Sequence, residues 1–106
     1  MAWIILGIAV FTEIIWALSL KWAATTGTWQ SAIVPIVLSF LNMALLALAM
    51  RDIPAGTAYA IWTGLGAVGV IIGGVILFGD KVTLVQAGFM ALIVIGVAGT
   101  KLNASV

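Results

Sequence analysis

A single carboxylate lies in the middle of a long apolar segment near the start of the chain. The stretch FTEIIW, residues 11–16, places Glu13 in an apolar run whose other polar members are Thr12 and Ser19. If this run spans a membrane, a charged side chain at its centre costs about 2.5–3.5 kcal/mol on insertion scales and has to face protein or a wet cavity. Low dielectric disfavours the ionised carboxylate unless a proton or a cation neutralises it. Glu13 therefore predicts a site at which a proton and a cation compete for the same oxygens. The alternative is a protonated Glu13 that only joins two helices by a hydrogen bond.

Aromatic residues accompany this carboxylate at helical spacing. Trp16 follows Glu13 by three residues and so shares its helix face. In the stretch GTAYAIWTGLG, residues 56–66, Tyr59 and Trp62 are also three residues apart. Aromatic rings offer flat walls and cation–π contact to a bound cation. We predict that these three residues and Glu13 bind a cation. Ordinary packing between helices explains Tyr59 and Trp62 about as well when they are considered alone.

The second apolar segment adds a polar pair, Ser39 and Asn42. A buried asparagine is unfavourable without partners, so we expect Asn42 to face the cavity as a binding residue or to hydrogen-bond a neighbouring helix. Val10, Ser39 and Thr63 are candidates for lining the pocket. The third segment is rich in glycine, and its glycines permit close helix contact or a bend that serves as a gate. The four glycines assigned to packing or gating are Gly64, Gly66, Gly69 and Gly73.

The elements that must position these residues are four membrane-spanning helices. The chain has 106 residues, of which 65% are hydrophobic and only 7% are charged, and a soluble domain usually needs about a quarter of its residues charged. About 20 residues cross the hydrocarbon as a helix. The sequence predicts one membrane domain over residues 1–106, an all-α four-helix bundle without a β-barrel. Its helices are predicted at approximately 3–21, 29–50, 56–78 and 84–103.

The residues that are missing exclude several classes of function. The chain has no cysteine and no histidine, and its three acidic residues lie in separate segments. We therefore expect no metal, no haem and no other cofactor. There is also no nucleophile–base pair and no cofactor loop, so the sequence does not indicate an enzyme.

The basic residues divide equally between the two sides of the membrane. With four spans, Arg51 and Lys101 fall on one side, and Lys21 and Lys81 fall on the other. Orientation follows the difference in Lys and Arg between the sides, and here that difference is zero. Because four short helices can hardly enclose a transport pathway alone, the balance favours insertion in both orientations and an antiparallel homodimer, an arrangement with inverted-repeat symmetry. Chance balance, with orientation set otherwise, is the alternative.

Two stretches of the sequence resemble a known family. FTEIIWALSLK (11–21) and IPAGTAYAIWTGLGAVG (53–69) are similar to the signature stretches of bacterial small multidrug resistance transporters, and the similarity runs the whole length, including Lys101. Trp16 and the GTAYAIWTG run resemble the guanidinium exporter branch. The resemblance implies an antiparallel homodimer in the bacterial cytoplasmic membrane, in which Glu13 binds protons and substrate in turn and Trp16, Tyr59 and Trp62 line the pocket.

The chain departs from that branch at two positions. The branch usually has a small residue, commonly glycine, in place of Val10, and serine in place of Asn42. Val10 would narrow the cavity beside the carboxylate, and Asn42 adds a donor and an acceptor. The main hypothesis is a proton-coupled antiporter for guanidinium or small substituted guanidinium cations. A broader exporter of quaternary ammonium compounds and a structural or pore-forming membrane subunit are the alternatives.

Overall fold

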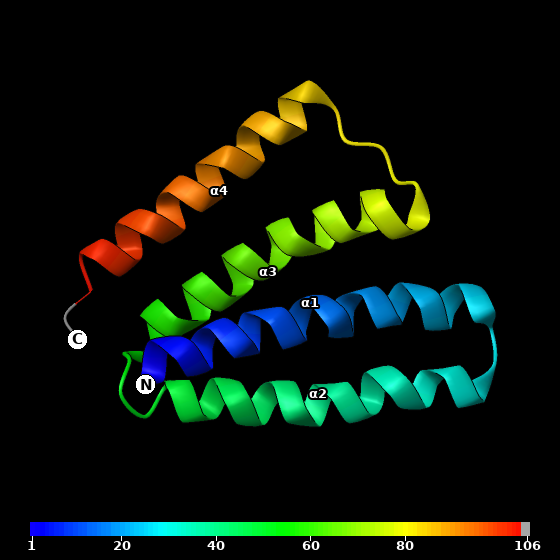
Figure 1. The fold of residues 1–106 in the computed structure, drawn as a ribbon, viewed down its shortest axis with the longest axis horizontal. Coiled ribbons are helices and arrows are strands. Elements are labelled where there is room, and N and C mark those ends of the chain that lie inside the picture. The colour runs from blue at the N-terminus through cyan, green and yellow to red at the C-terminus, as the bar shows by residue number, and fades with distance from the viewer. Residues whose placement is uncertain (105–106) are drawn as a thin grey trace.

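The computed structural model describes residues 1–104, and this part of the chain forms four α-helices and no strand (Figure 1). Each helix is long and apolar enough to cross a membrane. The four helices are α1 (Ala2–Thr26), α2 (Trp29–Ala49), α3 (Ala55–Phe78) and α4 (Leu84–Leu102).

The helix ends follow from local chemistry. α1 and α3 each end at a glycine in the left-handed conformation, Gly27 with φ 76° and Gly79 with φ 69°, a conformation that glycine adopts without a Cβ clash. α2 begins after Thr28, whose hydroxyl accepts a hydrogen bond from the Ser31 N–H at 3.3 Å. Thr83 and Gln86 form a reciprocal capping box at the start of α4, which satisfies two helix N–H groups.

The end of the first helix differs from the sequence prediction. The sequence predicted an end at residue 21, with a loop after it, whereas α1 continues to Thr26. None of residues 21–26 is glycine or proline, so nothing ends the helix before Gly27. The N–H of Gly27 donates to the Ala23 carbonyl at 3.0 Å and closes the last turn.

The helices form a layer rather than a closed bundle. Figure 1 shows them side by side in the order α2, α1, α3, α4, and the molecule measures 44 × 34 × 17 Å. α1 packs against both α2 and α3, while α4 packs along α3. Apart from Lys101 over the Trp3 ring, α4 does not pack along α1 or α2, so the four helices do not close into a bundle. Both faces of the layer are therefore open to lipid or to another protein.

The hydrophobic core lies toward the end of the layer that carries the N-terminus. It includes Leu6 and Val10 of α1, Leu46 of α2, and Ile61 and Trp62 of α3, and no residue of α4 is buried. Away from this core the packing is looser. A cavity of about 200 Å³ lies between α3 and α4, and its walls are Ile71, Ile72, Val75, Ile76, Val82, Ala87 and Met90.

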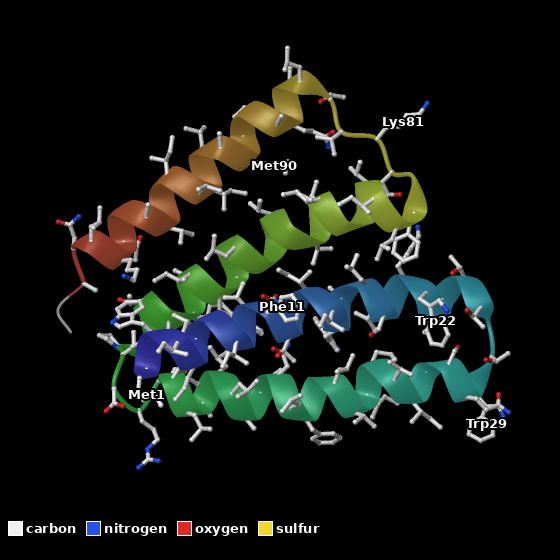
Figure 2. The ribbon with its side chains drawn as sticks, in the orientation of Figure 1. Met1, Phe11, Trp22, Trp29, Lys81 and Met90 are labelled. Carbon is white, nitrogen blue, oxygen red and sulfur yellow. The ribbon has the colours of Figure 1, made fainter. Side chains whose placement is uncertain are left out.

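The two ends of the layer carry equal numbers of basic residues. Figure 2 shows Met1 at one end and Trp22, Trp29 and Lys81 at the other. Arg51 follows the end of α2 and Lys101 lies in the last turn of α4, both at the Met1 end. Lys21 and Lys81 lie at the opposite end, so the fold keeps the equal division of basic residues that the sequence indicated.

Candidate functional site

The carboxylate of Glu13 lies between α1 and α3. The residue is half-buried, and its Oε2 atom is buried without a hydrogen-bond partner among the described residues. Oε2 occupies the space that a Cβ atom would need at Gly66 of α3. Because Gly66 has no side chain, the carboxylate can rest directly against the α3 backbone. We call this arrangement of Glu13 and Gly66 the carboxylate notch.

Three glycines of α3 face α1: Gly66, Gly69 and Gly73. A Cβ atom at Gly69 would overlap the Ile14 side chain, and one at Gly73 would lie 2.6 Å from Leu18 Cδ1. Gly64 faces the other neighbour, since a Cβ there would lie 2.9 Å from Val97 Cγ2 of α4. The third helix thus contacts α1 along one glycine face and α4 along another, and its bending as a gate stays a prediction.

The aromatic residues occupy different parts of the layer. Tyr59 and Trp62 pack against each other on α3, with ring centroids 5.6 Å apart and ring planes tilted by 45°. Trp62 is buried and its Nε1 atom has no partner among the described residues, while Tyr59 is 54% exposed. Trp16 lines a separate cavity of about 300 Å³ between α1 and α2, together with Ser39, Pro35 and neighbouring residues.

The polar pair of α2 is divided between two environments. Ser39 lines the cavity beside Trp16, and its hydroxyl donates to the Ile36 carbonyl at 2.7 Å. Asn42 is 2% exposed, does not line that cavity, and leaves its Oδ1 atom without a partner in the described chain. The sequence placed both residues on one helix face but could not separate these roles.

The two remaining predicted lining residues are Val10 and Thr63. Val10 is 8% exposed and belongs to the hydrophobic core, one turn before Glu13 on α1. Thr63 is exposed, and its hydroxyl donates to the Tyr59 carbonyl at 2.6 Å. Val10 therefore belongs to the packed core one turn from Glu13, while Thr63 lies on the surface of α3.

The carboxylate notch is the feature that sequence reasoning missed. Gly66 was assigned to packing or gating, and its spacing from Gly69 and Gly73 does put the three glycines on one helix face. Nothing in the sequence identified the helix that contacts this glycine face. The pairing of α1 with α3 depends on the order in which the helices lie side by side. Among residues 1–104 no group of three or more acidic, histidine or cysteine side chains could hold a metal.

Comparison with known proteins places the chain among transporters. The profile of one family, described as Small Multidrug Resistance protein, matches residues 1–93. The guanidinium exporter of Escherichia coli (strain K12) is 43% identical over 103 residues, which cover 97% of this chain and 98% of that protein. The guanidinium exporters of Proteus vulgaris and Yersinia pestis are 44% and 45% identical over 102 residues, covering 96% of this chain and 98% of each relative.

These matches span the four helices and the notch alike. The profile covers α1, α2 and α3 completely and the first half of α4, and the relatives extend over nearly all of both chains. The chain therefore belongs to the small multidrug resistance family.

Proposed function

We propose that this chain is a proton-coupled antiporter that exports guanidinium or small substituted guanidinium cations. One observation carries the proposal: Glu13 Oε2 is buried in the middle of a membrane-spanning helix and has no partner in the described chain. A buried acceptor without a donor is unfavourable. Either a proton or a cation with N–H groups relieves this cost, and the two ligands exclude each other at the same oxygens.

Membership of the family makes the chain a multi-pass membrane transporter rather than an enzyme. We place it in the cytoplasmic membrane of a bacterium, because the relatives in the comparison are bacterial proteins. No cofactor takes part in the proposed mechanism.

Guanidinium suits the residues that we assign to the pocket. It is planar, its N–H groups match the two oxygens of a carboxylate, and it stacks on aromatic faces. Glu13 supplies the carboxylate, and Trp16, Tyr59 and Trp62 are the aromatic residues that we assign to the pocket. Three relatives that are 43–45% identical to this chain carry the name guanidinium exporter, which supports the same substrate class.

The working unit in this proposal is an antiparallel homodimer. The layer leaves large apolar side chains exposed on its surface, and four helices in one layer do not enclose a pathway. A second copy facing the first would complete the pocket and bring a second Glu13 to it. The equal number of Lys and Arg side chains at the two ends supports opposite insertion of the two copies.

The transport cycle uses one site for two ligands. The protonated Glu13 pair turns from the outside to the cytoplasm and releases its protons as guanidinium binds. The loaded site turns outward, where protons displace the cation. Because one set of oxygens binds both ligands, coupling needs no separate proton relay. In an antiparallel dimer the two end states are equivalent by symmetry.

The test is electrophysiology on liposomes that contain the whole protein. Currents evoked by guanidinium, tetramethylammonium and phenyltrimethylammonium are recorded for the wild type and for Glu13→Gln. We expect a saturable guanidinium current that a higher proton concentration inhibits and that is absent in the variant. Size-exclusion chromatography shows that the variant is folded.

The alternatives predict different outcomes. Larger responses to the two quaternary ammonium ions would identify a broader exporter of such compounds. Pore formation would give a guanidinium current that does not saturate, and folded protein that is silent with all three cations would indicate a structural subunit. Any pH-driven exchange that persists in Glu13→Gln would refute the shared site.

A further inference from the structure

A groove of about 460 Å³ lies over α1 at the end of the layer that carries Trp22 (Figure 2). Its lining includes Ile15, Ser19 and Trp22 of α1, Val34 of α2, and Leu77 and Phe78 of α3. Because α1 lies between α2 and α3 in the layer (Figure 1), α1 forms the floor of the groove and the other two helices form its walls. We call this feature the α1 groove.

The α1 groove lies on the far side of α1 from the candidate site. Ile15 and Trp22 are two and nine residues from Glu13, and each residue turns an α-helix by about 100°. Both side chains therefore lie roughly opposite Glu13 around the helix axis. The groove also shares no lining residue with the cavity beside Trp16. It is a separate feature, and the proposed transport cycle does not use it.

The lining of the groove suits a hydrocarbon chain. It is aliphatic or aromatic apart from Ser19, whose hydroxyl already donates to the Trp16 carbonyl at 2.6 Å, so water finds few partners there. Ile15 and Trp22 are about 10 Å apart along the helix axis, which is within one leaflet of a hydrocarbon core about 30 Å thick. Trp22 lies near the end of α1, where tryptophan rings settle at the headgroup level. One acyl chain of a phospholipid therefore fits the groove with its headgroup beside Trp22.

Two basic residues flank the headgroup end of the groove. Lys21 immediately precedes Trp22, and Lys81 follows Phe78 by three residues. Both lysines are exposed, and a lysine stem can lie along apolar surface while its ammonium group reaches the polar layer. Phosphate oxygens accept strong hydrogen bonds from such ammonium groups.

Asp80 supplies a charge of the opposite sign at the same end. Its N–H donates to the Gly74 carbonyl at 3.2 Å, and a Cβ atom at Gly74 would lie 2.5 Å from Asp80 Oδ2, so the carboxylate rests against Gly74. Gly74 precedes Leu77 and Phe78 by three and four residues and shares their face of α3. The carboxylate therefore lies on the side of α3 that forms a wall of the groove.

We propose that the α1 groove binds a phospholipid with a primary-amine headgroup, phosphatidylethanolamine. One acyl chain lies between Val34 and Phe78, the phosphate accepts from Lys21 and Lys81, and the headgroup ammonium donates to the Asp80 carboxylate. The charges of this headgroup complement those of the protein. Phosphatidylcholine carries the same charges, but its quaternary nitrogen has no N–H to donate. Phosphatidylglycerol has no cation for the carboxylate.

The experiment titrates the whole protein in detergent with these three phospholipids, each with the same acyl chains. Native mass spectrometry gives the apparent affinity of the first bound lipid. The wild type is compared with Asp80→Asn, which removes a charge at nearly the same size, and with Val34→Phe, which fills the groove. Val94→Phe is the matched control, because Val94 is 43% exposed, like Val34 at 42%, and lies on α4 outside the groove.

We expect the wild type to bind phosphatidylethanolamine about threefold more tightly than either other lipid, the effect of one exposed charge pair. Asp80→Asn lowers the affinity for phosphatidylethanolamine about threefold. It raises the affinity for phosphatidylglycerol by about the same factor, because the carboxylate repels a purely anionic headgroup. Val34→Phe weakens all three lipids about fivefold or more, as overpacking does, and Val94→Phe matches the wild type.

Three results would overturn the proposal. Equal affinity of the wild type for the three lipids would mean that any lipid fills the groove. An unchanged ratio of phosphatidylethanolamine to phosphatidylglycerol binding in folded Asp80→Asn would separate the headgroup from Asp80. Equal binding by Val34→Phe and Val94→Phe would place the acyl chain outside the groove.

Circular dichroism shows whether each variant is folded. If Asp80→Asn does not fold, the lipid preference of the wild type and the comparison of Val34→Phe with Val94→Phe decide the proposal. The titration involves no transported cation, so failure of the proposed function leaves its outcome unchanged.

Discussion

The two neighbours of α3 contact it in different ways. Toward α1, three glycines of α3 receive the Glu13 carboxylate, Ile14 and Leu18 in close contact. Toward α4, a single glycine, Gly64, receives Val97 and Ile93, and a cavity of about 200 Å³ opens along the same helix pair.

This difference separates two tasks within a very small protein. Within residues 1–104, the buried polar atoms without partners all lie on α1, α2 and α3, whereas α4 buries no residue and has a capping box of its own at its first turn. The first three helices hold the site by close packing. The fourth helix packs along α3 on one side, has a capping box at its first turn, and leaves most of its surface for contacts outside the chain.

The largest expected effect comes from filling the carboxylate notch. Gly66→Ala places a methyl group where Glu13 Oε2 lies, so the carboxylate has to move. Displacing a positioned group by about 1 Å can cost ~100-fold in rate, and we expect a loss of that size in proton-driven guanidinium uptake. Gly56→Ala, with nothing within 4 Å of the new methyl, should transport like the wild type. Full activity in Gly66→Ala would show that the notch does not position Glu13.

A bulky residue on the small-residue face of α4 should weaken the contact between two copies of the chain. Gly88, Gly96, Gly99 and Ala91 form small-residue faces for which the sequence suggests a contact with a second copy. We expect Gly96→Leu to weaken dimer formation by about 1–3 kcal/mol, as overpacking does, without unfolding the chain. Dimer dissociation measured by single-molecule fluorescence in bilayers reports the change. Val94→Leu, roughly on the opposite side of α4, is the matched control, and equal dimerisation of both variants would place the contact elsewhere.

The start of α4 depends on its cap more than on packing. Thr83 accepts from the Gln86 N–H at 3.1 Å, and Gln86 Oε1 accepts from the Thr83 N–H at 2.9 Å. Thr83→Ala should cost about 1 kcal/mol of helix stability. Hydrogen exchange should then be faster in the first turn of α4 while the α1–α3 contact stays protected. A uniform increase over all four helices would mean that α4 is not independently stabilised.

The smallest effect concerns a contact that joins the outer helix to α1. Lys101 Nζ lies 5.1 Å from the ring centroid of Trp3, and a cation–π contact at an exposed site is worth about 0.5–1 kcal/mol. A double-mutant cycle with Lys101→Met and Trp3→Leu should give a coupling energy in this range from thermal unfolding in detergent. If the effects of the two substitutions are additive, the Lys101–Trp3 contact contributes no stability, and α4 is held by its packing on α3 alone.

Most of the fold could be predicted from apolar segment lengths. Four runs of about 20 residues, separated by short polar segments, were sufficient for the helix number and approximate bounds, because the bilayer thickness leaves little choice. The end of α1 was wrong by five residues, since residues 21–26 are polar enough to suggest a loop yet contain no helix breaker. Only the left-handed Gly27 ends the helix.

The site could be predicted only in part. A lone carboxylate at membrane depth identified Glu13, and helical spacing grouped it with Trp16. The contact of Glu13 with Gly66 and the burial of Asn42 depend on which helices are neighbours, and a sequence of similar apolar segments does not encode that order in any local signal. Ser39 and Asn42 share a helix face, but only packing reveals that one borders a cavity and the other is enclosed.

The aliphatic cavity between α3 and α4 also gives the surrounding lipid a part in the energetics. Its walls are apolar side chains, from Ile71 and Val75 on one side to Ala87 and Met90 on the other, so water gains little there. In a bilayer, lipid acyl chains fill this cavity when no protein side chain occupies it. Any motion that closes the cavity has to expel them. The work needed varies with chain length, unsaturation and lateral pressure, which makes membrane composition a determinant of how readily α4 moves against α3.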